Sequence, residues 1–243
     1  MKLIFVRHAD PDYSIDSLTP TGWKEAEALR DRIAKIPANG YYVSPLGRAR
    51  DTAKTCLEPL GIEAEIKPWL REFNIDVKKP NTPDDTDGDC VWDWMPIDWK
   101  ERPNFFLEDK WFLEPELVAC NVKEEHEKVI KGLDDFLSEK GYVREGLQYK
   151  AVRPNHDTYI FFCHFGLECV LIAHLINTSP MILWHGMCSA PSGVSILNTE
   201  ERMEGIASWR MSEFGDISHL YAKGMEPSFH ARFCECFTDD TIH

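Results

Sequence analysis

The chain has 243 residues, with 27 lysines and arginines against 41 aspartates and glutamates, which gives a formal net charge of −14. Nucleic-acid backbones and anionic membrane surfaces bind basic proteins, so this charge argues against a nucleic-acid partner and against a membrane partner. The 43% of hydrophobic and 28% of charged residues are typical of a globular protein, and the length suits one domain of α/β size or a core domain with a sizeable insertion.

The N-terminal residues and the cysteines predict a cytoplasmic protein. The apolar run at residues 3–6 is too short for the core of a signal peptide, and no run reaches the ~18 apolar residues of a membrane span. The eight cysteines are scattered along the chain, so we expect reduced thiols. Cys234 and Cys236, with His230, resemble half of a zinc site. No second ligand pair has matching spacing, so the sequence predicts no metal and no cofactor.

Strand and helix patterns alternate over the first 66 residues. Continuous apolar residues predict buried strands at 3–6 and 41–43, and alternation predicts a short edge strand at 62–66. Apolar residues at helical spacing predict helices over 23–36 and 49–60, the first stopped by a proline and the second by a glycine.

The composition changes in the middle of the chain. Residues 75–127 contain fifteen acidic and six basic residues, and four of the eight tryptophans also lie there. Frequent prolines in the same stretch favour loops and short helices over sheet core, so we interpret it as an insertion. A longer helix is predicted over 122–140, ended by Gly141.

The pattern of a buried core resumes near residue 158. An apolar strand at 159–163 precedes an apolar helix at 167–176. Two further strands are predicted at 193–197 and 205–211, joined by a polar turn at 198–202.

The alternation of strands and helices predicts the fold class α/β. We expect a three-layer α/β/α sandwich with a mostly parallel sheet. The chain is predicted to form a single domain over 1–243, with a core of about 1–74 and 158–220 and an insertion or lid of about 75–150.

Chemically active side chains follow several of these strands. Arg7 and His8 end the first strand, and His164 ends the strand near 160. Ligands bind outside the carboxyl ends of parallel strands, so we expect both histidines to face one crevice. Arg48 opens a helix after the second strand, where it suits phosphate oxygens, and Glu72 follows the third strand. Taken alone, each of these two residues is better explained as a solvated surface side chain.

Together these motifs resemble the histidine phosphatase superfamily, which has the phosphoglycerate mutase-like fold. The resemblance covers about 1–74 and 158–220. It consists of Arg7-His8-Ala9, Leu18-Thr19-Pro20-Thr21-Gly22, Ser44-Pro45-Leu46-Gly47-Arg48-Ala49-Arg50-Asp51-Thr52-Ala53, Glu72, His164 and Asp216-Ile217-Ser218-His219-Leu220.

The resemblance implies a metal-independent phosphomonoesterase that works through a covalent phosphohistidine on His8. Glu72 is then the general acid that protonates the leaving group and the base that activates water. Arg7, Arg48 and His164, together with His8, would bind the phosphate and stabilise its charge. The implied partner is a small-molecule phosphate ester or phosphate ion. The implied catalytic set is therefore His8, Arg7, Arg48, Glu72 and His164.

Three positions depart from the usual pattern of the family. Ala9 replaces a glycine, Ser14 stands where many relatives carry a phosphate-binding asparagine, and Phe165 replaces a glycine after the second histidine. The middle segment also lacks the paired arginines that hold a bisphosphate in the glycolytic mutases, which favours a phosphatase. A phosphoglycerate mutase-type phosphotransferase and a non-catalytic phospho-ligand-binding protein on the same fold remain the alternatives.

The aromatic residues of the insertion allow two interpretations. Trp92, Trp94, Trp99 and Phe105-Phe106 either line a pocket for an apolar or ring-containing leaving group or pack the insertion onto the core. The sequence does not distinguish a lid from an oligomer interface, and it does not define the oligomeric state.

Overall fold

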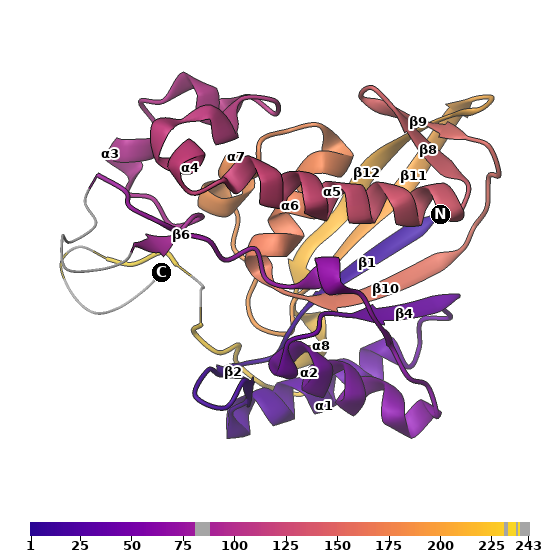
Figure 1. Cartoon of the computed structure of the whole chain (residues 1–243). Helices are drawn as coiled ribbons and strands as arrows, with labels where there is room; N and C mark the ends of the chain where they lie inside the picture. The colour runs from indigo at the N-terminus through magenta and orange to yellow at the C-terminus, as the bar shows by residue number, and fades with distance from the viewer. Residues whose placement is uncertain (81–87, 231–232, 237, 239–243) are drawn as a thin grey trace.

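The computed structural model describes residues 1–80, 88–230, 233–236 and 238. Its central sheet contains β1 (Lys2–Arg7), β4 (Gly40–Val43), β5 (Glu65–Ile66), β8 (Tyr142–Glu145), β9 (Gln148–Ala151), β10 (Thr158–Cys163), β11 (Val194–Met203) and β12 (Ile206–Asp216). The strand order is β5-β4-β10-β1-β11-β12-β9-β8 (Figure 1). The strands from β5 to β1 are parallel and those from β11 to β8 are added antiparallel, so the sheet is mixed.

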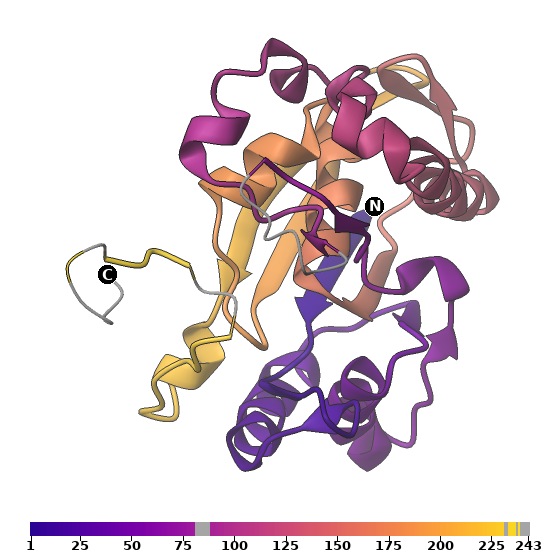
Figure 2. The same ribbon diagram turned by 60° about the vertical axis from the view of Figure 1, so that its left-hand side comes forward.

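Helices cover both faces of this sheet. On one face lie α1 (Pro20–Ile33) and α2 (Gly47–Leu57), and on the other lie α5 (Val122–Glu139) and α6 (Phe165–Ile176) (Figures 1 and 2). The alternation along β1 explains the layers, because Ile4 and Val6 pack with α1 and α2 whereas Leu3 and Phe5 pack with α5 and α6. The predicted three-layer α/β fold is confirmed.

The parallel strands place three strand ends at one edge of the sheet. Arg7 of β1 pairs with Cys163 of β10, and Phe162 of β10 pairs with Val43 of β4. The residues that directly follow these strands therefore meet at one place, as expected for a ligand site in a parallel sheet.

The middle of the chain is built from short elements. They are η1 (Glu58–Leu60), η2 (Pro68–Leu70), β6 (Asp76–Val77), β7 (Asp89–Cys90), α3 (Pro96–Trp99), η3 (Pro103–Phe106), η4 (Trp111–Leu113) and α4 (Pro115–Ala119). Trp94, Phe105 and Trp111 are buried in the larger hydrophobic core, so these aromatics pack the insertion onto the sheet. Residues 81–87 of the predicted insertion lie outside the described residues.

Two parts of the sheet differ from the prediction. The prediction of a polar turn at 198–202 is wrong, because β11 continues to Met203 and the chain turns only between Met203 and Ile206, where β12 begins. The polar strand ends carry ion pairs here: the Glu200 carboxylate lies 2.9 Å from Arg210 on the neighbouring strand β12 and 3.0 Å from Arg202 on its own strand. The hairpin of β8 and β9, which the sequence pattern did not indicate, extends the edge of the sheet beside β12.

The remaining elements are short. They are β2 (Pro11–Asp12), β3 (Ser17–Leu18), α7 (Pro180–Gly186) and α8 (Ser218–Tyr221). Within residues 1–80, 88–230, 233–236 and 238, no helix combines the length and the apolar character needed to cross a bilayer.

Candidate active site

The structure brings the five predicted site residues together at the shared strand edge. The rings of His8 and His164 are 5.1 Å apart between centroids. Nε of Arg48 lies 3.3 Å from Nε2 of His8, and the carboxylate of Glu72 is bound at the first turn of α6, directly after His164. Arg7 and His8 are each only 2% exposed, so the charge of Arg7 acts on His8 in a low-dielectric environment.

His8 is held in one tautomer with a free nitrogen. Its Nδ1–H donates to the carbonyl oxygen of Ala9 at 2.8 Å, which leaves Nε2 unprotonated to accept from Arg48. Burial, together with the positive charges of Arg7 and Arg48, lowers the pKa of His8 well below its usual value of 6.5. The imidazole is therefore neutral at pH 7 and its Nε2 lone pair is available as a nucleophile.

Arg48 is positioned by Asp16. Nη1 of Arg48 donates to Oδ1 of Asp16 at 2.6 Å, and Oδ2 of the same carboxylate accepts from the backbone N–H of Gly47 at 2.7 Å. Gly47 is required for this approach, because a β-carbon there would lie 1.9 Å from the carbonyl oxygen of Asp16. The carboxylate of Asp16, bound to the first residue of α2, thus holds the guanidinium of Arg48 beside His8.

Arg7 points into the site from the end of β1. One of its terminal nitrogens donates to the carbonyl oxygen of Ser189, and its guanidinium lies 5.9 Å from the ring centroid of Phe165. Among the described residues, Nε of Arg7 has no hydrogen-bond partner. A buried arginine with an unused donor is suited to an anionic ligand.

His164 is also buried and neutral. Its Nε2 lies 2.7 Å from Oγ of Ser44, the residue that follows β4, and the residue itself caps the N-terminus of α6. Burial, then the neighbouring His8 and Arg48, lowers the pKa of His164 well below its usual value. Ser44, which sequence reasoning did not assign a role, therefore fixes the orientation of the second histidine.

Glu72 accepts hydrogen bonds at the N-terminus of α6. Its Oε1 accepts from the backbone N–H groups of Phe73 and Leu167, each at 2.8 Å. Burial nevertheless raises the pKa of Glu72 above its ordinary value, because it outweighs these hydrogen bonds and the charges of Arg48 and Arg7. A carboxyl with a raised pKa next to a neutral histidine is an arrangement suited to acid–base chemistry.

Two residues of the loop after β1 lie in positions that the sequence pattern did not predict. Ser14, which occupies the position of the family's asparagine, is exposed and bonds only to Asp12 among the described residues. Tyr13 lies over Arg48 instead, with the guanidinium 5.2 Å from its ring centroid. Burial raises the pKa of the Tyr13 phenol, so the group stays protonated beside the arginines. No sequence signal distinguished Tyr13 from an ordinary loop tyrosine.

A second buried carboxyl, Glu168, lies one turn into α6. It is fully buried, and no hydrogen bond of ordinary geometry reaches either of its oxygens from the described residues. Burial raises its pKa to about 8, although Ser195 and Arg7 nearby oppose the shift. Sequence reasoning did not single out this group, because it reads as one residue of an apolar helix.

We expect the pKa of Glu168 to make the protein less stable as pH rises. The pKa of Glu168 is about 8 in the folded protein and 4.5 in the unfolded chain. Its contribution to the free energy of unfolding is therefore complete below pH 4.5 and is lost as pH rises toward 8. The loss is about 1.4 kcal/mol for each pH unit in that window. Glu168→Gln, which stays neutral, should therefore match the wild type near pH 5 and unfold at a higher temperature at pH 8. The same change at the exposed Glu204 serves as the control, and equal melting curves at pH 8 would contradict the assignment.

The cysteines and the suspected half zinc site show no metal-binding geometry. In the part of the chain that the structure describes, no three His, Cys, Asp or Glu side chains gather as a metal site would require. Nδ1–H of His230 donates instead to the carboxylate of Asp10. All eight cysteines lie within the described residues and none of them forms a disulfide.

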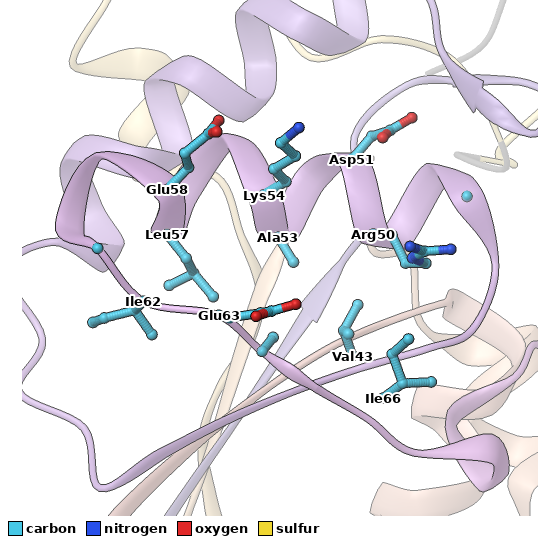
Figure 3. Close-up of a pocket in the computed structure, with 13 residues that line it drawn as sticks. Val43, Arg50, Asp51, Ala53, Lys54, Leu57, Glu58, Ile62, Glu63 and Ile66 are labelled. Atoms are coloured by element: carbon cyan, nitrogen blue, oxygen red, sulfur yellow. The ribbon is translucent and has the colours of Figure 1, made fainter.

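A cavity of about 590 Å³ lies away from the histidines, between α2 and β5 (Figure 3). Its lining carries charges of both signs, Arg50 and Lys54 against Glu58 and Glu63, and includes none of the five predicted site residues. This cavity is therefore separate from the candidate site at the strand edge.

Comparisons with known proteins agree with this geometry. Residues 3–212 match the histidine phosphatase superfamily (branch 1). None of the curated proteins compared with the chain matches it. Similar solved structures include a phosphoserine phosphatase from Entamoeba histolytica, 17% identical with a TM-score of 0.57, covering 90% of this chain and 98% of that one.

Two further structures have the same fold. A mycobacterial glucosyl-3-phosphoglycerate phosphatase is 16% identical, with a TM-score of 0.53 and coverage of 88% of this chain and 98% of that one. An α-ribazole phosphatase from Shigella flexneri is 18% identical, with a TM-score of 0.53 and coverage of 89% of this chain and 97% of that one.

Proposed function

Because the chain belongs to the histidine phosphatase superfamily, we propose that it is a phosphatase that hydrolyses small-molecule phosphate monoesters through a phosphohistidine on His8. The single observation that supports this most is the state of His8. Its Nδ1–H is held by Ala9 and its Nε2 faces Arg48, so a neutral nucleophile stands directly beside a fixed phosphate-binding cation. The similar structures are those of phosphatases for phosphoserine, glucosyl-3-phosphoglycerate and α-ribazole phosphate, which agrees with a small substrate.

The first half of the reaction forms the phosphoenzyme. Nε2 of His8 attacks phosphorus, the bond from phosphorus to the ester oxygen breaks, and Glu72 gives its proton to the departing oxygen. Arg7 and Arg48 carry the charge of the equatorial phosphate oxygens, with His164 as a further hydrogen-bond donor. The arginines neutralise the phosphate charge, which is why we propose that no metal ion takes part.

The second half releases phosphate. The carboxylate of Glu72, now deprotonated, takes a proton from water while the water oxygen attacks phosphorus. The bond between phosphorus and Nε2 of His8 breaks, which restores the neutral imidazole and the protonated acid. The raised pKa of Glu72 supports this role, because a carboxyl that holds its proton above the ordinary range can act as the acid near neutral pH.

The proposal is tested by steady-state hydrolysis of a generic aryl phosphate. We expect turnover in the presence of a chelator, with no gain from added divalent metal and no need for a bisphosphate primer. Dependence on a primer would support a mutase-type phosphotransferase. Tight binding of inorganic phosphate without turnover of a panel of sugar, nucleotide and aryl phosphates would support a non-catalytic phospho-ligand-binding protein instead.

A further inference from the structure

The C-terminal segment, defined here as residues 225–230 and 233–236, follows α8 and contacts the loop after His8. The backbone N–H of Ser228 donates to Oε1 of the buried Glu25 at 3.0 Å. Oε2 of the same carboxylate accepts from the backbone N–H of Asp10 at 2.8 Å, and Asp10 accepts from His230. The segment is therefore tied directly to the loop that follows His8.

Phe233 of this segment joins two aromatic side chains from distant parts of the chain. Its ring centroid lies 6.2 Å from that of Trp92 and 5.6 Å from that of Phe165, and Trp92 and Phe165 are 5.9 Å apart. The three rings contact one another in pairs at distances typical of favourable aromatic packing. We call Trp92, Phe165 and Phe233 the aromatic trio.

The aromatic trio lies between the phosphate-binding and acid groups of the proposed site. The ring of Phe165 faces the guanidinium of Arg7 at 5.9 Å. On the other side, a β-carbon placed on Gly166 would lie 2.7 Å from Nε1 of Trp92 and 2.9 Å from Oε1 of Glu72. The indole N–H and the proposed general acid therefore flank the same point over the first turn of α6.

This position is where a leaving group must go. In an in-line displacement the ester oxygen departs on the side of phosphorus opposite His8, toward the group that protonates it. A substituent on that oxygen, next to Glu72, would meet Trp92 and Phe233, the two partly exposed rings of the aromatic trio, which pack on the buried Phe165. Nε1 of Trp92 is buried and has no hydrogen-bond partner among the described residues, so it offers one unused donor at the same place.

The other aromatics of the insertion are engaged elsewhere. Trp94 packs on Phe105 in the core, and Trp99 stacks on His185 and contacts Phe106. Of the aromatic residues that the sequence marked in the insertion, Trp92 is the one whose ring contacts Phe165 beside His164.

We propose that the aromatic trio is the leaving-group subsite, that the substrate is a phosphate monoester of an apolar ring-containing alcohol, and that Phe233 determines this specificity. The inference rests on the proposed phosphatase activity and deepens it. Three aromatic residues outside the proposed catalytic set, including one from the C-terminal segment, then select the alcohol, while the strand-edge residues act on any phosphate. An acceptor atom near the ester oxygen would accept from the N–H of Trp92, which binds no acceptor among the described residues.

The test compares two substrates across matched variants. For the wild type, Phe233→Ala and Phe233→Leu, kcat/KM is measured with 1-naphthyl phosphate and with β-glycerophosphate, and thermal unfolding is recorded. Loss of one aromatic contact should lower kcat/KM for the naphthyl ester about 10-fold and leave the glycerol ester almost unchanged. For Phe233→Leu, kcat/KM with the naphthyl ester should lie between the values of the wild type and of Phe233→Ala. Phe106→Ala, which removes a half-exposed ring of the insertion that contacts Trp99, is the control and should keep the wild-type ratio.

The outcomes separate the two levels of the proposal. If the wild type hydrolyses neither ester, the proposed phosphatase activity is wrong. If it hydrolyses both and Phe233→Ala leaves their ratio of kcat/KM unchanged, the aromatic trio only packs the C-terminal segment onto the domain. A lower melting temperature with an equal loss for both esters also overturns the subsite, because it indicates a purely structural role.

Discussion

Replacement of His8 by alanine should lower kcat by at least ~10³-fold, because the variant loses the atom that attacks phosphorus. The fold should persist, since the imidazole makes one local hydrogen bond to Ala9 and one contact to Arg48. Arg7 and Arg48 remain, so the variant should still bind inorganic phosphate. The measurements are steady-state hydrolysis of an aryl phosphate and calorimetric titration with phosphate.

A matched control and a chemical trap make this result specific. His156→Ala changes an exposed histidine near the opposite end of β10 and should keep full activity. Rapid denaturation of the working wild type at alkaline pH should show a peptide containing His8 with one added phosphoryl group, which acid treatment then removes, and His8→Ala should lack this group. Wild-type rates in His8→Ala would disprove the covalent mechanism.

The site could be predicted from sequence where a strand ends in a chemically distinctive residue. Arg7, His8 and His164 each terminate a strand of continuous apolar residues, and the parallel register that joins those strands follows from burial on both faces. Arg48 opens a helix directly after a strand, and its assignment to the site depends on the resemblance of residues 44–53 to the family motif. These side chains lie together because strand and helix boundaries determine where they are placed, and their catalytic roles stay a prediction.

The parts that sequence reasoning missed depend on contacts between distant segments. Asp16 takes its role from the hydrogen bond that it accepts from Gly47, and Ser44 takes its role from its hydrogen bond with His164. Neither contact has a local sequence signal. The same holds for Glu25, which joins the loop after β1 to the C-terminal segment. No sequence signal singled out Glu168, because one acidic residue in a helix is usually exposed to solvent. Only the structure shows that this helix is buried on all sides.

Replacement of Glu72 by glutamine should separate the two halves of the reaction. The amide of the Glu72→Gln variant has nearly the same shape as the carboxyl group and can accept the backbone hydrogen bonds of Phe73 and Leu167, but it cannot give or take a proton at that site. With an aryl phosphate, whose leaving group needs little protonation, we expect a burst of one phenolate per enzyme followed by turnover slowed about 10²- to 10⁴-fold. With an alkyl phosphate the burst should disappear, because the first step then also needs the acid.

The pH dependence gives the same assignment an independent test. His8 must be neutral and Glu72 protonated for kcat/KM, and their pKa values are shifted in opposite directions, downward for His8 and upward for Glu72. The acid limb of kcat/KM should therefore lie well below 6.5, and the alkaline limb should report the loss of the proton from Glu72. Glu72→Gln should abolish the alkaline limb and retain the acid limb. Because Glu168 is a second buried carboxyl beside Arg7, Glu168→Gln is the decisive comparison. An alkaline limb that vanishes in Glu168→Gln and persists in Glu72→Gln would show that Glu72 is not the general acid.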